Sequence, residues 1–232
     1  MKGGGPPAAA TQSGRGRDAL KISEIFLSIQ GEGLDTGLPT VFVRTVGCNL
    51  RCDWCDTKYA LRGGTEMGID EILKRVRNFK CRRICVTGGE PLVHEGTMAL
   101  LRRLLARGLE VSVLTNGSVP IGSLFTLPHG RSLRISMDIK CPSSKMHGEM
   151  KLGNIAKLRA MDQLKFVVRD TKDYAHAKRI LARHPTRATV IFQPVWGARG
   201  ASVAEAILKD GLDARVMVQM HKVLWGRRAR GR

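Results

Sequence analysis

The sequence predicts an α/β protein in which about six or seven parallel strands form an open or partial barrel. Strand-like and helix-like segments alternate along most of the 232 residues, which is typical of a parallel sheet with helical crossovers. Polar motifs also follow the strand-like segments. Ligands of parallel α/β sheets bind at the carboxyl ends of the strands, so these motifs predict a site at one edge of the sheet.

The predicted elements begin at residue 20. An apolar stretch at 20–33 runs into a glycine-flanked turn, and the β-branched segment 40–46 is predicted as a strand because Pro39 and Gly47 bound it. Further strands are expected at 82–87, 110–117, 133–140, 163–170, 188–195 and 214–220. Helical spacing of apolar residues predicts helices at 69–79, 94–108, 173–184 and 202–211.

One core domain at 19–226 is expected. Residues 1–18 are rich in Gly, Pro, Ala and Ser and predict a disordered leader, whereas residues 227–232 form a basic tail with four arginines. No apolar run approaches the roughly 18 residues that span a bilayer, and the N-terminus lacks a secretory pattern. A cytoplasmic protein is therefore expected, in which clustered cysteines more often bind metal or do chemistry than form disulfides.

The chain is strongly basic, with a formal net charge of +19 and a pI near 10.4. Residues 1–18 carry a net +2 and residues 227–232 a net +4, so +13 lies on the body. Such a charge attracts nucleic acid and other polyanions. Aromatic residues make up only 5% of the chain, which argues against a base-stacking platform. A generally basic surface is favoured over a dedicated nucleic-acid site.

Three of the six cysteines, Cys48, Cys52 and Cys55, lie within eight residues in a C-x3-C-x2-C spacing. A structural zinc site usually has four ligands in two close pairs, and here the next histidine after the three cysteines is His94. A [4Fe-4S] cluster with three cysteine ligands and one open iron fits this spacing better. Zinc binding and incidental thiols remain the alternatives.

The cysteine motif resembles the signature of the radical S-adenosylmethionine (SAM) superfamily, with Trp54 before the last cysteine. The GGEP sequence after Thr87 resembles the second motif of that superfamily. The resemblance implies a partial, open (β/α)6-type barrel in which the open iron binds SAM and the reduced cluster cleaves SAM to a 5′-deoxyadenosyl radical. It also implies that the turn at Gly88, Gly89 and Glu90 receives the SAM amino group.

Four segments together resemble the 7-carboxy-7-deazaguanine synthase family: EIFLSIQGEG (24–33), FVRTVGCNLRCDWCDT (42–57), DIKCPSS (138–144) and QMHK (219–222). The likeness runs from about residue 20 to 225. It implies a radical SAM lyase that contracts the ring of 6-carboxy-5,6,7,8-tetrahydropterin and releases ammonia, for the biosynthesis of queuosine- or archaeosine-type nucleosides. It also implies Mg2+, an external flavodoxin- or ferredoxin-like electron donor and a homodimer.

The resemblance assigns roles to individual residues. Thr57 would bind Mg2+, although alone it would be predicted as a helix cap or turn residue. The implied substrate contacts are Ile29, Gln30, Gly31, Glu32, Arg44, Thr87 and His221. The implied SAM contacts are Trp54, Cys55, Asp56, Gly88, Gly89, Glu90, Asp138, Ile139, Lys140, Gln193, Pro194, Val195 and Trp196.

Two of these assignments have a basis in residue chemistry. Arg44 lies in an apolar strand, where a charge needs a partner, and its planar guanidinium suits a carboxylate; a solvated arginine is the alternative. Glu32 could accept hydrogen bonds from the pterin edge. His221 has no such basis, because a lone histidine is more often a surface or core residue. Members of the family often end near this point, so the continuation WGRRARGR leaves the role of a terminal carboxylate open.

Two other functions fit parts of the sequence. Another radical SAM enzyme, such as a glycyl-radical activase, would share the cysteine spacing but would not explain Arg44, Thr57 and the QGEG turn together. A basic RNA-binding module that contains zinc or a cluster would bind nucleic acid with a steep salt dependence and would not turn over SAM.

Overall fold

A computed structural model describes residues 18–128, 130–227 and 230–231. Of the predicted leader only Asp18 falls within these residues, and the rest of the leader lies outside them. The predicted basic tail is described at Arg227, Arg230 and Gly231. No helix in the described part of the chain is long and apolar enough to cross a bilayer.

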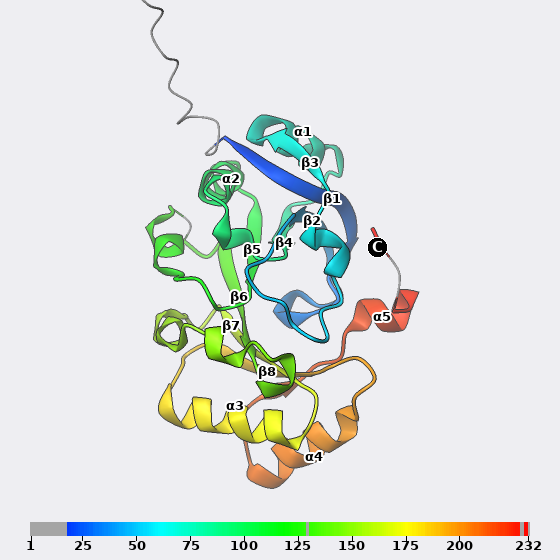
Figure 1. Ribbon diagram of the computed structural model, residues 1–232. Helices are drawn as coiled ribbons and strands as arrows, with labels where there is room; N and C mark the ends of the chain where they lie inside the picture. Colours follow the sequence, from blue (N-terminus) through cyan, green and yellow to red (C-terminus); the bar gives the residue numbers. More distant parts are fainter. Residues whose placement is uncertain (1–17, 129, 228–229, 232) are drawn as a thin grey trace, which may run out of the picture.

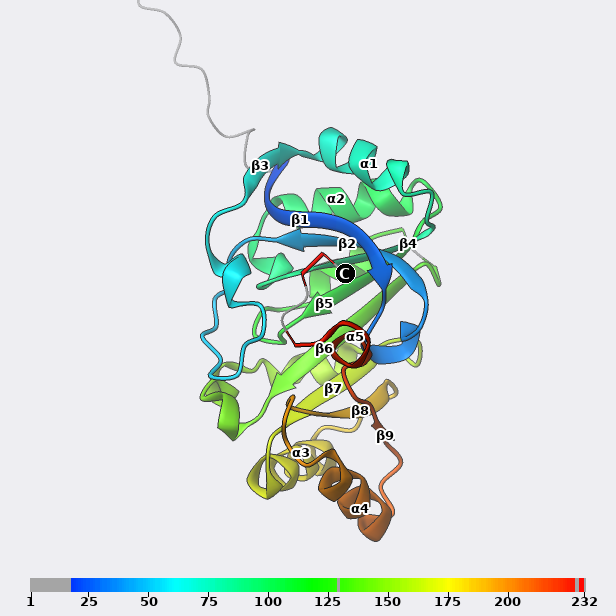
Figure 2. The ribbon, with the colours of Figure 1, turned by 90° about the vertical axis from the view of Figure 1, so that its right-hand side faces the viewer.

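The described residues form one curved sheet of nine strands, in the order β3-β1-β2-β4-β5-β6-β7-β8-β9. From β2 to β9 all neighbours are parallel, whereas β1 is antiparallel to both β2 and β3. Figure 2 shows the strands fanning out in this order. The strands are β1 (Ala19–Ile29), β2 (Pro39–Thr45), β3 (Thr65–Gly68), β4 (Arg83–Gly88), β5 (Glu110–Thr115), β6 (Leu133–Lys140), β7 (Gln163–Val168), β8 (Thr189–Pro194) and β9 (Arg215–Val216).

Of the five α-helices within the described residues, four pack in pairs near the two ends of the sheet (Figure 1). α1 and α2 lie near β1, β3 and β5, and α3 and α4 lie near β7 and β8. The fifth, α5, lies in front of the middle of the sheet in Figure 2. The helices are α1 (Ile69–Asn78), α2 (Gly96–Leu105), α3 (Thr171–Arg183), α4 (Gly200–Asp210) and α5 (Met220–Trp225).

The predicted α/β class and open parallel sheet are confirmed, but one predicted strand was wrong over most of its length. The expected strand at 214–220 is a strand only at Arg215–Val216, and a helix begins at Met220. In the connections between β5 and β6 and between β6 and β7, for which no helix was predicted, the chain forms only short 3-10 helices. The strand β3 was not anticipated from the sequence.

The antiparallel pairing of β1 with β2 follows from the short connection at 30–38. Antiparallel neighbours can be joined by a short turn, whereas a parallel pair needs a crossover of a dozen residues or more. Ile29 pairs with Pro39, so this connection lies at the amino end of β2. The cysteine loop leaves β2 at the other end, after Thr45.

Fully buried aliphatic residues of the sheet and of α1 and α2 form the core. Ile84 on β4 and Val113 on β5 have almost no exposed surface, and Leu100, Leu101 and Leu104 form the inner face of α2. Burying one such side chain is worth about 1.5–3 kcal/mol. These helices therefore hold the strands that carry the cysteine loop and the double-glycine turn.

We expect Leu100→Ala to lower the free energy of unfolding by about 2–5 kcal/mol, because it leaves a cavity against the sheet. Urea denaturation measures this loss. The matched control is Leu208→Ala on α4, where the leucine is 80% exposed and the expected change is within about 0.5 kcal/mol. Equal losses in both variants would contradict the described core.

Candidate active site

A cavity of about 480 Å3 opens at the carboxyl edge of the sheet and extends along its concave face. Its walls include the cysteine loop, the turn at Gly88 and Gly89, and the inward-facing Lys165 of β7. A neighbouring cavity of about 940 Å3 shares Asp138, Lys140 and Lys165 and continues to Gln193 and Trp196. Both volumes are in the range of small-molecule and cofactor sites.

The three motif cysteines all line the smaller cavity, are half-buried and are free of disulfides. The sulfur of Cys48 accepts hydrogen bonds from the Leu50 N–H at 3.4 Å and from the Asn116 side-chain amide at 3.6 Å. Hydrogen bonds of this kind stabilise cluster-bound sulfurs and tune their reduction potential. Three unpaired thiols from one loop, facing open space, fit a cluster with three protein ligands.

Trp54 fastens the cysteine loop to β6 and the turn after it. Its indole N–H donates to the Ser143 hydroxyl at 3.1 Å, and the Lys140 ammonium lies 5.3 Å from the centre of its ring. The Ser143 hydroxyl is in turn hydrogen-bonded to the buried carboxylate of Asp173 on α3. The loop is thereby held at Trp54 as well as at Cys48, which Asn116 contacts.

The double-glycine turn packs directly on the start of the cysteine loop. A Cβ on Gly89 would lie 2.0 Å from the Gly47 carbonyl oxygen, and one on Gly88 would lie 2.3 Å from the Thr45 hydroxyl. The Glu90 N–H donates to the Gly47 carbonyl at 2.9 Å. The glycines are therefore required for this backbone contact, whatever the turn also binds.

The Glu90 side chain is fully buried and faces the protein interior. Its carboxylate accepts hydrogen bonds from the Thr115 hydroxyl at 2.9 Å and from the backbone N–H groups of Leu92 at 3.0 Å and Asn116 at 2.6 Å. Burial raises the pKa of Glu90 despite these bonds. Glu90 thus positions Asn116 against Cys48. Because the Glu90 side chain faces the interior, only the backbone of Glu90 could contact a ligand.

Glu32 enters the concave face from the β1–β2 connection. Its carboxylate accepts from the Lys165 ammonium at 2.6 Å and from the Gln219 amide at 2.8 Å. Burial opposes ionisation, but these two partners outweigh it and hold the pKa of Glu32 far below its ordinary range. Lys165 is itself almost inaccessible and also pairs with Asp138 at 3.2 Å, so both groups remain charged.

Asp56, directly after the motif cysteine Cys55, extends this network to α5. The Lys222 ammonium donates to its carboxylate at 2.6 Å and the Gln219 amide at 3.1 Å. The Thr57 hydroxyl donates to the other oxygen of the same carboxylate at 2.9 Å. Burial would raise the pKa of Asp56, but the Lys222 charge reverses this and lowers it.

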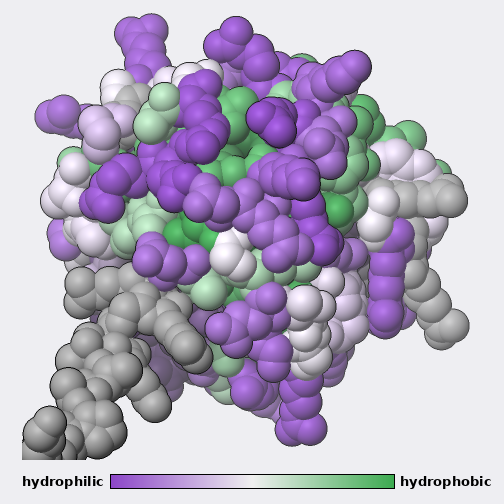
Figure 3. Space-filling view, turned by 90° about the horizontal axis from the view of Figure 1, so that it is seen from above, coloured by the Kyte–Doolittle hydropathy of each residue, from purple (hydrophilic) through white to green (hydrophobic). Residues whose placement is uncertain are grey.

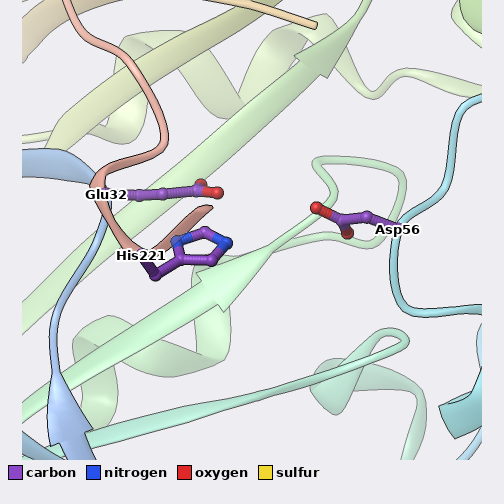
Figure 4. A group of neighbouring side chains, drawn as sticks. All are labelled: Glu32, Asp56 and His221. Atoms are coloured by element: carbon purple, nitrogen blue, oxygen red, sulfur yellow. The ribbon is translucent and has the colours of Figure 1, made fainter. Parts of the chain in front are cut away.

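His221 meets Glu32 and Asp56 at the centre of the site (Figure 4). One ligand atom from each of these residues lies within 4.8 Å of the others. The imidazole packs on Gly31, where a Cβ would come 2.2 Å from Nδ1. Burial lowers the pKa of His221 although Glu32 and Asp56 oppose the shift, so the ring is neutral at pH 7. Two carboxylates and a neutral imidazole could bind a divalent cation.

Arg44 has the partner that an apolar strand requires. Its Nε donates to Glu24 on the neighbouring strand at 2.6 Å, and the Tyr59 hydroxyl donates to the same oxygen at 2.7 Å. Its two terminal nitrogens make no hydrogen bond within the described residues. The guanidinium of Arg230 lies 4.3 Å from the centre of the Tyr59 ring, so part of the basic tail reaches the cavity mouth.

The remaining predicted contacts divide between the two cavities and the interior. Gln193 lines the larger cavity, and its buried side-chain oxygen has no hydrogen-bond partner in the described chain. Residues that line one of the cavities are Thr87, Gly88, Gly89, Asp138, Lys140, Gln193, Val195 and Trp196. Residues that line neither cavity are Ile29, Gln30, Gly31, Glu90, Ile139 and Pro194, of which Ile139 lies in the hydrophobic core.

Sequence reasoning missed Lys165, Asn116, Gln219 and Lys222. Lys165 had a usable signal, because it lies in the apolar segment QLKFVV as Arg44 lies in TVFVRTV. Gln219 and Lys222 lie in the same QMHK segment as His221, in which only the histidine was predicted as a site residue. Asn116 gave no signal beyond its place after a strand.

A sequence model of the Radical SAM superfamily matches residues 42–171. The chain is 39% identical over 223 residues to the 7-carboxy-7-deazaguanine synthase of Methanospirillum hungatei, which covers 96% of this chain and 91% of that protein. It is 40% identical over 207 residues to the enzyme of the same name from Thermoplasma acidophilum, with coverage of 89% and 98%.

Two solved structures share the fold. QueE from Escherichia coli matches with a TM-score of 0.71 and 21% identity, over 88% of this chain and 95% of that chain. SuiB from Streptococcus suis, bound to S-adenosylmethionine, matches with a TM-score of 0.55 and 11% identity, over 75% of this chain and 48% of that chain.

We expect Gly89→Ala to lower the free energy of unfolding by about 1–3 kcal/mol, because the new methyl group must displace the Gly47 backbone. The matched control is Gly153→Ala, since a Cβ at Gly153 would have no neighbour within 4 Å. Urea denaturation of both variants measures the difference. A Gly89→Ala protein as stable as the control would refute the close backbone contact.

Glu32 links the stability of the fold to pH. Its pKa in the folded protein lies far below the ordinary value of 4.5, so in acid the unfolded chain takes up a proton that the folded protein excludes. The free energy of unfolding should therefore fall as the pH drops below 4.5.

In Glu32→Gln we expect a lower unfolding free energy at pH 7 and a shallower loss in acid, measured by urea denaturation over a series of pH values. Asp56 keeps part of the dependence, because its pKa is also lowered. An acid dependence as steep as that of the unmodified chain would show that Glu32 is not held ionised.

Proposed function

This chain belongs to the 7-carboxy-7-deazaguanine synthase family of the radical SAM superfamily, and we propose that the cavity beside its cysteine loop is where it contracts 6-carboxy-5,6,7,8-tetrahydropterin to 7-carboxy-7-deazaguanine, with release of ammonia. One observation carries the assignment of this cavity. The three cysteines, the double-glycine turn, and the polar side chains of Glu32, Arg44 and His221 line the same cavity or meet beside it.

Members of the superfamily carry a [4Fe-4S] cluster and SAM, and the residues of this cavity suit both. Cys48, Cys52 and Cys55 would hold the cluster, with Asn116 and the Leu50 N–H supporting the Cys48 sulfur. When bound, the cluster and SAM together supply the radical that starts the ring contraction. The backbone at Gly88 and Gly89, together with the unpaired oxygen of Gln193, provides acceptors for the polar groups of SAM.

The substrate side of the cavity presents complementary groups for a carboxylated pterin. The ionised Glu32 carboxylate can accept hydrogen bonds from the 2-amino edge of the ring. Arg44 uses only Nε on Glu24, which leaves its terminal nitrogens for the substrate carboxylate. His221, neutral at pH 7 and next to Glu32, can accept or return a proton as nitrogen leaves. Lys165 keeps Glu32 oriented and charged throughout.

A divalent cation is part of this proposal. The Thr57 hydroxyl and the Asp56 carboxylate are adjacent oxygen ligands of the kind Mg2+ prefers. They lie at the end of the cysteine loop, where Mg2+ would also be able to meet a substrate carboxylate. Lys222 balances the Asp56 charge when the cation is absent.

We further expect a flavodoxin- or ferredoxin-like protein as the one-electron donor, a homodimer in solution and a cytoplasmic location. Size-exclusion chromatography with light scattering tests the dimer. The product, 7-carboxy-7-deazaguanine, would then be used in the biosynthesis of queuosine- or archaeosine-type nucleosides.

The function is tested by anaerobic reconstitution with iron and sulfide, followed by assay with SAM, a chemical reductant, Mg2+ and the carboxylated tetrahydropterin. We expect 7-carboxy-7-deazaguanine and ammonia to form. Release of 5′-deoxyadenosine without consumption of the pterin would contradict the proposed reaction and favour another radical SAM enzyme.

Two variants test the assigned residues in the same assay. Cys52→Ser should lose both the visible absorbance of the cluster and all turnover, because one of three iron ligands is removed. Thr57→Val should need more Mg2+ for half-maximal rate, whereas Thr57→Ser, which keeps the hydroxyl, should not. An unchanged Mg2+ requirement in Thr57→Val would remove Thr57 from the cation site.

A further inference from the structure

A basic groove of about 600 Å3 lies on the part of the molecule formed by α1 and α2, away from the active site. It is bounded by the last turn of α1, the loop that leads into β4, and the loop after α2. Figure 3 looks onto the end of the molecule where α1 and α2 lie and shows hydrophilic side chains gathered around hydrophobic ones. No residue of this groove lines either cavity of the active site.

The groove carries five cationic side chains and a single carboxylate. That carboxylate, Asp70, forms an ion pair with Arg103 beside the groove, so it does not neutralise the groove itself. None of the five cations is in an ion pair with another described residue. These cations are Lys74, Arg77, Lys80, Arg82 and Arg107.

Helix dipoles explain only part of this charge. α1 and α2 both end at the groove, and the C-terminus of a helix carries about half a negative charge, which favours nearby cations. Two helix ends therefore account for roughly one positive charge, whereas the groove holds five. The excess is available to an anionic ligand.

The floor of the groove is apolar. It consists of Leu73 and Val76 of α1, which are largely buried, together with Cys81 and Leu109. An apolar floor surrounded by cations matches a nucleotide, whose base has a flat apolar face and whose phosphates are anionic. A bare anion such as inorganic phosphate would use the cations and leave the floor uncovered.

Lys80 adopts a backbone conformation that is unfavourable for lysine. It follows the end of α1 with a φ of +50°, the left-handed region in which glycine ends helices without strain. Lysine at this position places a cation at the groove where glycine would give a more stable helix end. Strain of this kind collects at binding sites.

The groove and the cysteine loop lie at opposite ends of the same strands. β4 runs from Arg83, next to the groove, to Gly88, at the active-site cavity. Six residues of strand span about 20 Å. A ligand in the groove therefore leaves the cavity mouth open.

We propose that this groove is a second binding site, which holds a single-stranded nucleic acid with its phosphates on the five cations and one base on the apolar floor. The net charge of +19, far above what one carboxylated substrate requires, is consistent with a polyanionic partner. No aromatic residue of the described chain lines the groove, so binding depends mainly on phosphate contacts and hence on salt.

The test is fluorescence anisotropy of a short labelled single-stranded RNA with the full-length chain at several salt concentrations. We expect Arg77→Gln/Arg82→Gln/Arg107→Gln to weaken binding at least tenfold near 0.1 M salt. The slope of log Kd against log salt should fall by about two, since each lost phosphate contact on a single strand contributes about 0.7.

The matched control also removes three arginines, but from the opposite end of the molecule. Arg179, Arg183 and Arg187, on and after α3, are all exposed, and Arg179→Gln/Arg183→Gln/Arg187→Gln should keep nearly all of the binding. Equal losses in the two triple variants would overturn the proposal, because binding would then reflect overall charge.

Polyglutamate competing as well as unlabelled RNA would overturn the assignment of a nucleotide ligand. If free AMP competes as well as RNA at the same concentration of nucleotides, the ligand is a mononucleotide and the proposal of a single strand is overturned.

Lys80→Gly separates the binding role of the lysine from a structural one. It should raise the melting temperature by about 2 °C, because it relieves the left-handed strain, and at the same time weaken RNA binding severalfold. Binding at full strength in Lys80→Gly would remove Lys80 from the site. Synthase turnover should stay unchanged in every groove variant, which keeps this test independent of the proposed reaction.

Discussion

The active site depends on one connected network of ion pairs and hydrogen bonds that runs through the concave face of the sheet. Lysines this deeply buried are tolerated only when each has an anionic partner, because an unpaired charge costs several kcal/mol in such surroundings. Each member therefore fixes the next, and the strands, the β1–β2 connection, the cysteine loop and the last helix are tied together. Its members, in order of contact, are Lys140, Asp138, Lys165, Glu32, Gln219, Asp56 and Lys222.

This network prepares the cavity for a polar ligand before the ligand arrives. Glu32 and Asp56 are held ionised and in fixed positions by Lys165 and Lys222, so binding does not require them to reorient. Preorganised charges of this kind cost nothing to rearrange during a reaction. The backbone contact between Gly47 and Gly89 likewise fixes the cysteine loop relative to the double-glycine turn, which lines the same cavity.

Several parts of the fold and of the candidate site could be predicted from the sequence because their signals are local. The cysteine spacing, the strand before it and the GGEP turn are each contained in a few consecutive residues. The prediction of a strand at 214–220 was wrong because contacts with distant residues determine the structure of this segment. Its β-branched residues favour a strand, but the backbone beyond Val216 turns away so that Gln219 and Lys222 reach Glu32 and Asp56, 187 and 166 residues earlier in the chain. No spacing rule shows such pairings, and tertiary contacts override local propensity.

These long-range pairings also set the order in which the protein can mature. Glu32 and Asp56 are translated well before their partners Gln219 and Lys222, which follow 187 and 166 residues later in the chain. The sheet from β1 to β8 can begin to form as the chain emerges, because domains fold progressively during translation, but the wall beside the cysteine loop closes only when α5 docks. Until α5 docks, a nascent chain therefore exposes its three motif cysteines on a cavity that lacks one wall. A cluster inserted before that point would enter an open cavity, and one inserted later would enter a closed one.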